Sequence, residues 1–459
     1  MSAPSPARVA ALDRIARQAN RFPDLDFVDA SAPPTADGVR LEPRDLALAR
    51  AIEHAVVQRW LTLAAVGRAC VDRRWENVDE RVQAAILAGA AQLLLFGNQA
   101  DFAVVDDTVE WSKRKGRRGA AGFVNAVLRR VASLRGDIAE NMPGMPGMFS
   151  GLAADRMPLP DGRVLQLTRP VFSQDLITRL SEQTSHGEEL LLHWTNTAGR
   201  ERCLARAAHG LTDAPTVIAG IGAAELAPGS PFAAHLRPHG QPGFFLWEGD
   251  HAGLVALLAA APHARVQDAA SAQPVQLTQG MRPRLILDAC AGRGTKTRQL
   301  AQLHPDAEIV ATDRDGHRLR ALALAFEGHP RVKVTTPEGL RRVVGKVDLL
   351  ALDVPCSNTG VLPRRAEAKY RFSRRRLDSV VQLQKSILEE YRLMMAPGAS
   401  VLYSTCSLEA IENDRQAEWI ARRLGGRVLR TDAREPQGFP GDPPTAYADG
   451  SYAALIGPG

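Results

Sequence analysis

Residues 347–360 read Val-Asp-Leu-Leu-Ala-Leu-Asp-Val-Pro-Cys-Ser-Asn-Thr-Gly, and the fold can be worked out from this stretch. Its apolar first half is typical of a strand that is buried on both faces of a parallel sheet. The reactive residues Asp353 and Cys356 follow, at the carboxyl end where open α/β sheets bind ligands. A second run of strand-forming residues, 400–405, ends in Cys406. The sequence therefore predicts two cysteines at two strand ends of one sheet.

Predicted strands and helices alternate regularly from residue 284 onward. Alternation of this kind indicates a parallel, doubly wound sheet, so we expect a Rossmann-like domain over residues 276–459. The strands are expected near residues 284–289, 308–313, 331–336, 347–353 and 399–405, and the helices near residues 295–303, 316–327, 378–395 and 411–424.

A glycine-containing loop, residues 288–297, joins the first strand of this domain to its first helix. Gly292 and Gly294 allow a tight turn and the close approach of a ligand to backbone N–H groups. A phosphate-binding P-loop is excluded, because Thr295 and Cys290 stand where that motif needs glycine. A dinucleotide fingerprint is only weakly matched, because threonine replaces its last glycine.

The acidic residue Asp313 ends the second predicted strand, about 20 residues after Gly294, where an acid meets the ribose hydroxyls in doubly wound folds. The alternative is that Asp313 only caps the helix that follows it. A nucleoside without a polyphosphate, such as S-adenosylmethionine, suits this loop better than ATP or NAD. The candidate cofactor-binding residues are Cys290, Ala291, Gly292, Arg293, Gly294, Thr295, Lys296, Asp313 and Asp353.

The first third of the chain has helical periodicity and no strand signal before about residue 160. Apolar residues recur at steps of three and four, which predicts an all-helical bundle over residues 41–140. Residues 1–40 are expected to be a partly flexible lead-in with one short helix. Two Pro-Gly pairs indicate a linker over residues 141–160. A small α+β region is expected over residues 161–275.

The 459-residue chain has the composition of a globular protein, with 45% hydrophobic and 24% charged residues. Its formal net charge of +6 favours a polyanionic partner, although a charged surface that only aids solubility would look the same. The five scattered cysteines have no zinc spacing, and we expect no metal. No signal-peptide core and no run of about 18 apolar residues is present, so a cytoplasmic protein is expected.

One predicted helical face carries many cations, which in isolation is more often a solvated face than a binding site. Residues 116–130 read Gly-Arg-Arg-Gly-Ala-Ala-Gly-Phe-Val-Asn-Ala-Val-Leu-Arg-Arg. This segment, within residues 40–135, resembles the helical RNA-binding domain of the antitermination factor type (N-utilisation substance B). The resemblance implies RNA contact by Lys113, Arg114, Lys115, Arg117, Arg118, Asn125, Arg129 and Arg130.

The two cysteine motifs, Asp353-Val-Pro-Cys356 and Thr405-Cys-Ser407, are followed by Glu412-Asn413. Together they resemble the RNA 5-methylcytosine methyltransferases, and with the helical domain they resemble the bacterial family that modifies small-subunit ribosomal RNA. The resemblance implies S-adenosylmethionine as cofactor, ribosomal RNA as partner, no membrane association, and a monomer.

The resemblance also implies a role for each reactive residue. C5 of cytosine is a poor nucleophile, so the thiolate of Cys406 would first add to C6. Asp353 would hold the base near N3 and N4, and Cys356 would assist release of the product. Lys296 would lie near the cofactor or the base. The cytosine would have to be flipped out, because a stacked base hides C6.

This chain departs from the family in the cofactor loop, which usually reads Cys-Ala-Ala-Pro-Gly-Gly-Lys and here reads Cys290-Ala-Gly-Arg-Gly-Thr-Lys296. Thr295 would have to avoid positive φ, so the loop geometry or the cofactor affinity is expected to differ.

Residues 362–376 are basic with interleaved aromatic residues, which favours RNA contact over a merely solvated loop. The candidates are Arg364, Arg365, Lys369 and Tyr370. Two alternatives stay open at this point: the same chemistry on transfer RNA, and a non-catalytic RNA-binding or ribosome-assembly factor on the same fold.

Overall fold

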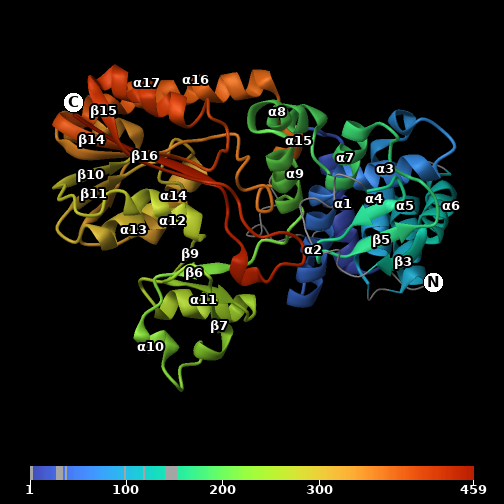
Figure 1. The fold of residues 1–459 in the computed structure, drawn as a ribbon. Helices are drawn as coiled ribbons and strands as arrows, with labels where there is room; N and C mark the ends of the chain where they lie inside the picture. The colour runs from blue at the N-terminus through green and yellow to red at the C-terminus, as the bar shows by residue number, and fades with distance from the viewer. Residues whose placement is uncertain are drawn as a thin grey trace. The chain divides into compact units, whose positions relative to one another are not determined.

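The computed structural model describes residues 4–26, 35–36, 39–97, 100–116, 119–139 and 152–458. The chain forms two compact units, which exchange segments along the sequence (Figure 1). We call Met1–Asp213, Leu362–Ser373 and Phe439–Asp442 the helical unit. The sheet unit consists of Ala214–Val361, Arg374–Gly438 and Pro443–Gly459.

The helical unit is built around α4 (Glu80–Leu95), most of whose residues are buried. The Asp79 side chain caps this helix by accepting a hydrogen bond from the Arg81 N–H at 3.0 Å. Gly89 lets α6 pack closely, because a Cβ there would lie 2.5 Å from Leu128. The helices around α4 are α1 (Pro6–Ala19), α2 (Pro43–Gln58), α3 (Trp60–Cys70), η1 (Trp75–Asn77), α5 (Asp101–Lys115) and α6 (Ala120–Ser133).

The rest of the helical unit contains short strands and four more helices. The strands are β1 (Thr35–Ala36), β2 (Val39–Arg40), β3 (Arg135–Ala139), β4 (Arg156–Pro158) and β5 (Val164–Leu167), and the last three form an antiparallel sheet in the order β3-β5-β4. The helices are α7 (Leu176–Thr184), α8 (Glu188–Ala198), α9 (Arg200–His209) and α15 (Ala368–Arg371).

These observations revise the expected domain boundaries. Helix α1 contributes Leu12 and Ile15 to the core of the bundle, so it is not part of a lead-in. The expectation of no strands before residue 160 is wrong, because β1 to β4 precede it. Residues 152–213 belong to the helical unit rather than to a separate α+β region. Most of the expected linker, residues 140–151, lies outside the described residues.

The main sheet of the sheet unit has seven strands in the order β12-β11-β10-β13-β14-β16-β15. Neighbours from β12 to β14 are parallel, and β16 runs antiparallel to both β14 and β15. The strands are β10 (Leu285–Asp288), β11 (Glu308–Ala311), β12 (Val332–Val334), β13 (Val347–Asp353), β14 (Met395–Thr405), β15 (Gly426–Arg434) and β16 (Ser451–Pro458).

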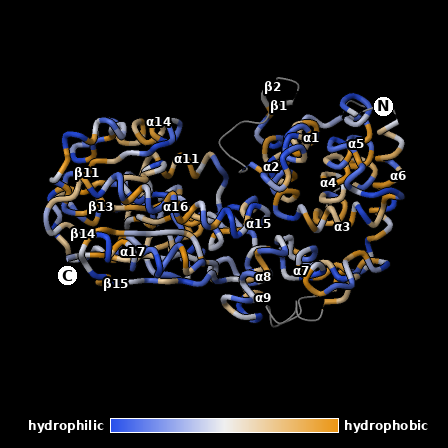
Figure 2. The backbone as a smooth tube through the Cα atoms, turned by 90° about the horizontal axis from the view of Figure 1, so that it is seen from above, coloured by the Kyte–Doolittle hydropathy of each residue, from blue (hydrophilic) through white to orange (hydrophobic). Residues whose placement is uncertain are grey.

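Helices and two hydrophobic cores cover the two faces of this sheet. Along β13, Leu350 and Leu352 lie in one core, and Leu349 and Ala351 lie in the other. The strand is thus buried on both faces, as its apolar run predicts, and the expected Rossmann-like fold is confirmed. The helices of this part of the sheet unit are α12 (Ala269–Gln276), α13 (Thr295–Leu303), α14 (Gly316–Ala325), α16 (Arg374–Tyr391) and α17 (Asp414–Leu424), with the 3-10 turns η4 (Pro337–Val343), η5 (Arg392–Met394) and η6 (Pro444–Ala446). Figure 2 shows apolar and polar residues alternating along α14, α16 and α17.

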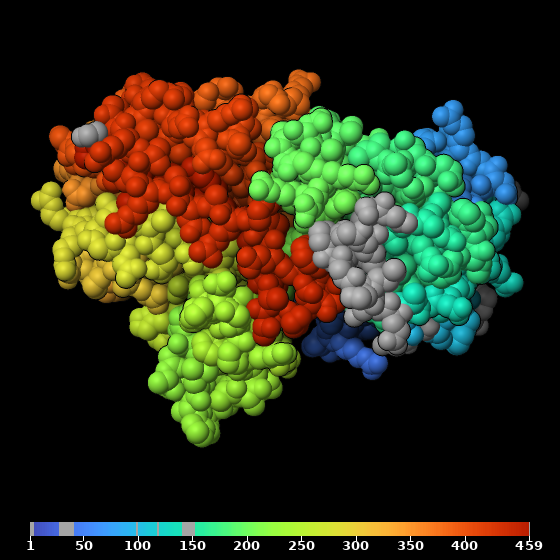
Figure 3. All heavy atoms as spheres, viewed as in Figure 1, coloured from blue at the N-terminus to red at the C-terminus, as the bar shows by residue number. Residues whose placement is uncertain are grey.

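A smaller antiparallel sheet with the order β7-β8-β6-β9 precedes the main sheet in sequence. It consists of β6 (Val217–Ala219), β7 (Leu236–Pro238), β8 (Phe244–Trp247) and β9 (Arg265–Val266), with α10 (Ala223–Leu226), η3 (Ala233–His235) and α11 (His251–Ala260). Figure 3 shows this part as a lobe of the sheet unit. Over the described residues, every helix is too short or too polar to cross a lipid bilayer.

Candidate active site

Strands β13 and β14 bring the two cysteine loops to the same edge of the sheet. The strands are parallel, and Asp353 pairs with Ser404 in the register. Because both carboxyl ends point the same way, the residues that follow them are neighbours. The Ser404 hydroxyl donates a hydrogen bond to Asp353 Oδ1 at 2.7 Å. The predicted meeting of Cys356 and Cys406 at two strand ends is therefore present.

The Sγ atoms of Cys356 and Cys406 are 3.1 Å apart, and both residues are partly exposed. Asn358 connects the two loops: its Oδ1 accepts from Cys406 Sγ at 3.3 Å, and its Nδ2 donates to the Cys356 carbonyl at 2.9 Å. Asn358 has a φ of 61°, a conformation that asparagine tolerates better than most residues. Gly360 is needed for the same approach, because a Cβ there would lie 2.8 Å from the Cys406 carbonyl.

The two thiols do not have the same surroundings. The hydrogen bond to Cys406 and, next, burial raise the pKa of Cys356 well above its ordinary value, and Glu412 adds to the rise. Cys356 is therefore held as a thiol at neutral pH. The other cysteine of the sheet edge, Cys290, is partly exposed and also has a raised pKa, because its thiol is desolvated and three carboxylates are near it.

Lys296 and Asp353 form an ion pair beside the thiols. The Lys296 Nζ lies 2.8 Å from Asp353 Oδ2 and 3.3 Å from Ser271 Oγ. Burial acts to lower the pKa of Lys296, but the Asp353 carboxylate outweighs it and raises that pKa. The site thus holds a fixed cation and a fixed carboxylate next to two sulfur atoms, which is a set suited to nucleophilic addition to a polar ring.

The glycine loop lies at the same edge, between β10 and α13. The Asp313 carboxylate accepts from the Gly292 N–H at 2.9 Å and from the Asp315 N–H at 2.8 Å. A Cβ placed on Gly292 would meet nothing within 4 Å, so there is open space over the loop. Open space beside a buried acid fits the adenosyl end of S-adenosylmethionine.

The substitution of glycine by Thr295 does not strain the loop. Thr295 is the first residue of α13, and among the described residues only Ser185 and Asn358 have positive φ without being glycine. The left-handed positions are taken by Gly292, with a φ of 59°, and Gly294, with a φ of 87°. Thr295 therefore avoids positive φ, as the sequence predicts. Arg293 is exposed on the loop.

The predicted RNA-contact residues of the helical unit fall at the end of α5 and on α6. Lys113 and Arg114 are exposed and pair with Glu110 at 2.9 and 3.4 Å. Arg129 and Arg130 are also exposed, whereas Lys115 and Asn125 are partly exposed. Arg117 and Arg118 lie outside the described residues.

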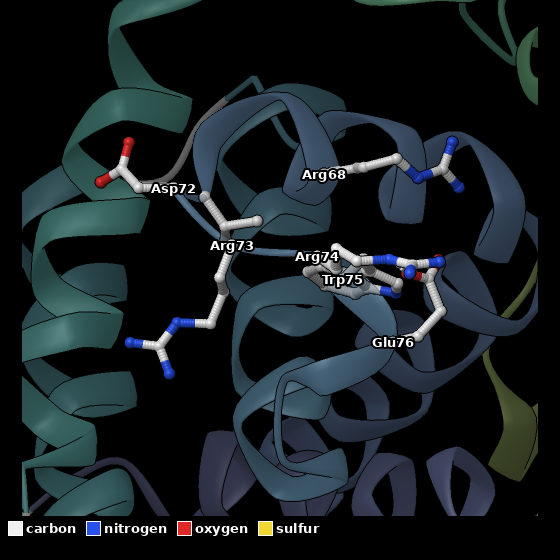
Figure 4. Close-up of a pocket in the computed structure, with 7 residues that line it drawn as sticks. Arg68, Asp72, Arg73, Arg74, Trp75 and Glu76 are labelled. Atoms are coloured by element: carbon white, nitrogen blue, oxygen red, sulfur yellow. Dashed lines mark ion pairs between the residues drawn. The ribbon is translucent and has the colours of Figure 1, made fainter.

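A neighbouring arginine-rich loop was not predicted. An open hollow is lined by Arg68, Val71, Asp72, Arg73, Arg74, Trp75 and Glu76 (Figure 4). The loop is tied to α6, because the Arg130 Nη1 donates to the Cys70 carbonyl and Arg73 lies 4.6 Å over the Phe123 ring. The run Asp72-Arg-Arg-Trp75 places two cations beside an aromatic residue, and this pattern could have predicted the loop from the sequence.

Two of the four RNA contacts expected in residues 362–376 are wrong. Lys369 and Tyr370 are 0% and 8% exposed, and both are buried in the helical unit. The Tyr370 hydroxyl donates to the Val57 carbonyl at 2.7 Å and accepts from the Trp60 N–H at 3.1 Å. Burial lowers the pKa of Lys369 well below its ordinary value. Arg364 and Arg365 are partly exposed and stay candidates.

Comparison with known proteins agrees with this description. Two relatives called ribosomal RNA small subunit methyltransferase B align over most of their length. The protein from Xanthomonas campestris pv. campestris is 27% identical over 451 residues (90% of this chain, 89% of the relative). The protein from Vibrio cholerae serotype O1 is 26% identical over 447 residues (94% of each chain).

Solved structures show the same fold at low identity. The crystal structure of PH0851 has a TM-score of 0.68 at 16% identity and covers 99% of each chain. A methyltransferase homolog protein from Pyrococcus horikoshii has a TM-score of 0.50 at 20% identity, covering 62% of this chain and 100% of that one. Residues 276–441 match the family described as 16S rRNA methyltransferase RsmB/F, and residues 6–133 match the NusB family. The chain therefore contains an RsmB/F-type rRNA methyltransferase domain over residues 276–441 and a NusB-family helical domain over residues 6–133.

Proposed function

We propose that this protein forms 5-methylcytosine in small-subunit ribosomal RNA through a covalent adduct between Cys406 and C6 of the base. The observation that carries the proposal is the pair of Sγ atoms, 3.1 Å apart, at the sheet edge that also holds Lys296 and Asp353. A protein that only binds RNA has no use for two adjacent thiols beside an ion pair.

The first step uses Cys406 as the nucleophile. Its sulfur forms a bond to C6, the C5–C6 double bond opens, and electron density moves onto C5. Asp353 holds the edge of the base near N3 and N4, and the Lys296 ammonium offsets the negative charge that develops in the ring. S-adenosylmethionine, when bound, supplies the methyl group that C5 takes.

Release of the product uses Cys356. Water takes the proton from C5, the electron pair of that C–H bond forms the C5–C6 double bond again, and the C6–S bond breaks with its electron pair going to the sulfur of Cys406. The Cys356 thiol, 3.1 Å away and held protonated, is placed to give its proton to that departing sulfur. A neutral thiol beside the nucleophile therefore suits the release of the product better than the addition to C6.

The cofactor is S-adenosylmethionine, and the glycine loop would hold it. Asp313 would accept from the ribose hydroxyls, because its carboxylate retains free lone pairs beyond the two backbone N–H groups that it binds. The open space over Gly292 would take the nucleoside. The remaining contacts would come from Cys290, Ala291, Arg293, Gly294, Thr295, Lys296 and Asp353.

RNA would be bound by cations of the helical unit. These are Lys113, Arg114, Lys115, Arg117, Arg118, Arg129 and Arg130, with Asn125 and, in the segment Leu362–Ser373 of the same unit, Arg364 and Arg365. Arg68 of α3 and Arg73 and Arg74 of the loop that follows it extend this set. The names of the relatives favour ribosomal over transfer RNA as substrate. We place the protein, as a monomer, in the bacterial cytoplasm with that RNA.

Bisulfite sequencing of ribosomal RNA tests the proposal. A strain that lacks this gene should lose one protected cytosine in the small-subunit RNA, and the wild-type gene should restore it. A gene with Cys406→Ala should fail to restore it. Full restoration by that variant, or a lost site only in transfer RNA, would contradict the proposal.

A further inference from the structure

The two cysteine loops share a buried carboxylate, Glu412, which is 0% exposed. The Ser357 N–H donates to Glu412 Oε1 at 2.9 Å, and the Ser357 hydroxyl donates to Oε2 at 2.5 Å. The Ser407 hydroxyl also donates to Oε2 at 2.5 Å. Because each serine directly follows a cysteine, one carboxylate fixes the chain on the far side of both thiols.

Glu412 is itself held from two other elements. Gln384 of α16 donates to Glu412 Oε1 at 3.0 Å and to the Pro355 carbonyl at 3.0 Å. The Tyr403 hydroxyl of β14 donates to the Glu412 carbonyl at 2.6 Å. Burial raises the pKa of Glu412 and these hydrogen bonds oppose the rise. The backbone N–H and the amide of Gln384 can only donate, so they suit the carboxylate, which can only accept.

The charges around the two sulfur atoms are unequal. Cys356 faces Cys406, the Glu412 carboxylate and the Tyr403 phenol. Cys406 faces Asn358 and the Lys296 ammonium, which in turn pairs with Asp353. A negative group therefore lies on the Cys356 side and a positive group on the Cys406 side.

We propose that Glu412 is a positioning residue that ties the two cysteine loops together and places its carboxylate on the Cys356 side of the thiol pair. This role of Glu412 rests on the proposed function, which makes Cys406 the nucleophile and Cys356 the residue that assists product release. The difference between the thiols exists without RNA or cofactor, so it can be measured without the reaction.

Alkylation by iodoacetamide measures each thiol in the free protein. The thiolate sulfur displaces iodide, and initial rates at the two cysteines can be followed by mass spectrometry of the separate tryptic peptides that contain them. In the wild-type protein, Cys406 should react faster than Cys356 at every pH from 7 to 9. Faster alkylation of Cys356 than of Cys406 in this pH range would overturn the proposal. This measurement needs only the wild-type protein.

Glu412→Gln removes the charge and keeps the size of the side chain. It should raise the rate at Cys356 several-fold at pH 8 and raise the ratio of Cys356 to Cys406 labelling. Glu412→Asp, which keeps the charge, should stay near the wild-type ratio. An unchanged ratio in Glu412→Gln, or equal rises at both thiols, would leave Glu412 a merely structural residue.

Asp348→Asn is a matched control. Asp348 accepts from the Arg284 and Leu285 N–H groups at 2.8 and 3.1 Å, but at the opposite end of β13. This variant also turns a carboxylate into an amide, and it should leave both labelling rates unchanged. A protein with the predicted labelling but no methylated RNA would contradict the proposed function and leave the role of Glu412 in place.

Discussion

Asp288, at the end of β10, is a single residue whose burial gives the protein a pH dependence. Its side chain is 1% exposed and accepts from the Thr297 hydroxyl at 2.7 Å. Burial raises the pKa of Asp288 to about 7, against 3.8 in an unfolded chain. Between these values the folded protein keeps a proton that the unfolded chain has released. Rising pH therefore lowers the free energy of unfolding across this range.

Asp288→Asn should remove that dependence. In the wild type, the contribution from this group falls by up to about 1.4 kcal/mol per pH unit between pH 4 and 7. The asparagine can still accept from Thr297 and does not titrate, so its unfolding curve should be flatter over this range. Urea unfolding at a series of pH values measures the difference. Parallel curves for the two proteins would contradict the burial of a protonated acid.

At the scale of single residues, the reacting groups can be predicted from the sequence, but the contacts that hold them in place cannot. Cys356, Cys406 and Asp353 could be predicted because they follow strand-like runs directly. The contacts of Asn358 and Glu412 depend on which loops meet, and no local pattern encodes that. Lys369 and Tyr370 were assigned to RNA because a basic, aromatic run looks the same whether it is exposed or buried.

Among the elements, the loop between α3 and η1 carries two arginines, Arg73 and Arg74, that are held less firmly than Arg130 of α6, which packs against it. Arg130 donates to the Cys70 carbonyl at 2.9 Å and to Asp72 at 2.8 Å, so it caps the carboxyl end of α3. Arg74 makes only a long ion pair of 3.8 Å with Glu76, and its side chain is 82% exposed. Charge at Arg73 and Arg74 is therefore more available to RNA phosphates than charge at Arg130.

A double variant, Arg73→Gln with Arg74→Gln, should weaken RNA binding and leave folding intact. Losing two phosphate contacts should lower the slope of log affinity against log salt by about 2. Fluorescence anisotropy with a ribosomal RNA fragment at several salt concentrations measures it. Arg341→Gln with Arg342→Gln, another adjacent exposed pair, is the control and should keep the wild-type slope. Equal slopes in all three proteins would remove this loop from the RNA surface.

Elements of the main sheet were predicted best where strands and helices alternate. Strand β13 and helix α13 have the expected bounds, because buried apolar runs and a glycine turn mark them clearly. The antiparallel strands β15 and β16 are not predicted from the sequence. Strand β15 lies at the sheet edge and has mixed polarity, whereas β16 is buried between β14 and β15 but stands outside the regular alternation of strands and helices. Helix α1 was placed outside the bundle because its packing partners, α2 and α4, are distant in sequence.

At the scale of the whole molecule, the chain leaves the sheet unit soon after Cys356 and contributes Leu362–Ser373 to the helical unit. Tyr370 anchors this segment, and its hydroxyl also lies 3.0 Å from Ser185 Oγ. Tyr370→Phe should cost the helical unit about 1 to 3 kcal/mol, because the Val57 carbonyl and Trp60 N–H lose a buried partner. RNA affinity below the melting temperature should not change.

Measurements of thermal unfolding and of RNA binding by the Tyr370→Phe variant test the expected loss of stability and the expected unchanged affinity. A wild-type melting temperature with weaker RNA binding would mean that Tyr370 stacks on RNA after all. The segment is then a binding loop rather than part of the core.

The proposed mechanism depends most on the different roles of the two thiols: Cys406 adds to the base, and Cys356 assists its release. Incubation of each variant with small-subunit ribosomal RNA and S-adenosylmethionine, followed by a denaturing gel, tests it directly. Cys356→Ala should trap a covalent protein–RNA band, because Cys406 adds to the base and is not released. Cys406→Ala and the double variant should give no band. A band from Cys406→Ala, or none from Cys356→Ala in a folded protein, would contradict the account.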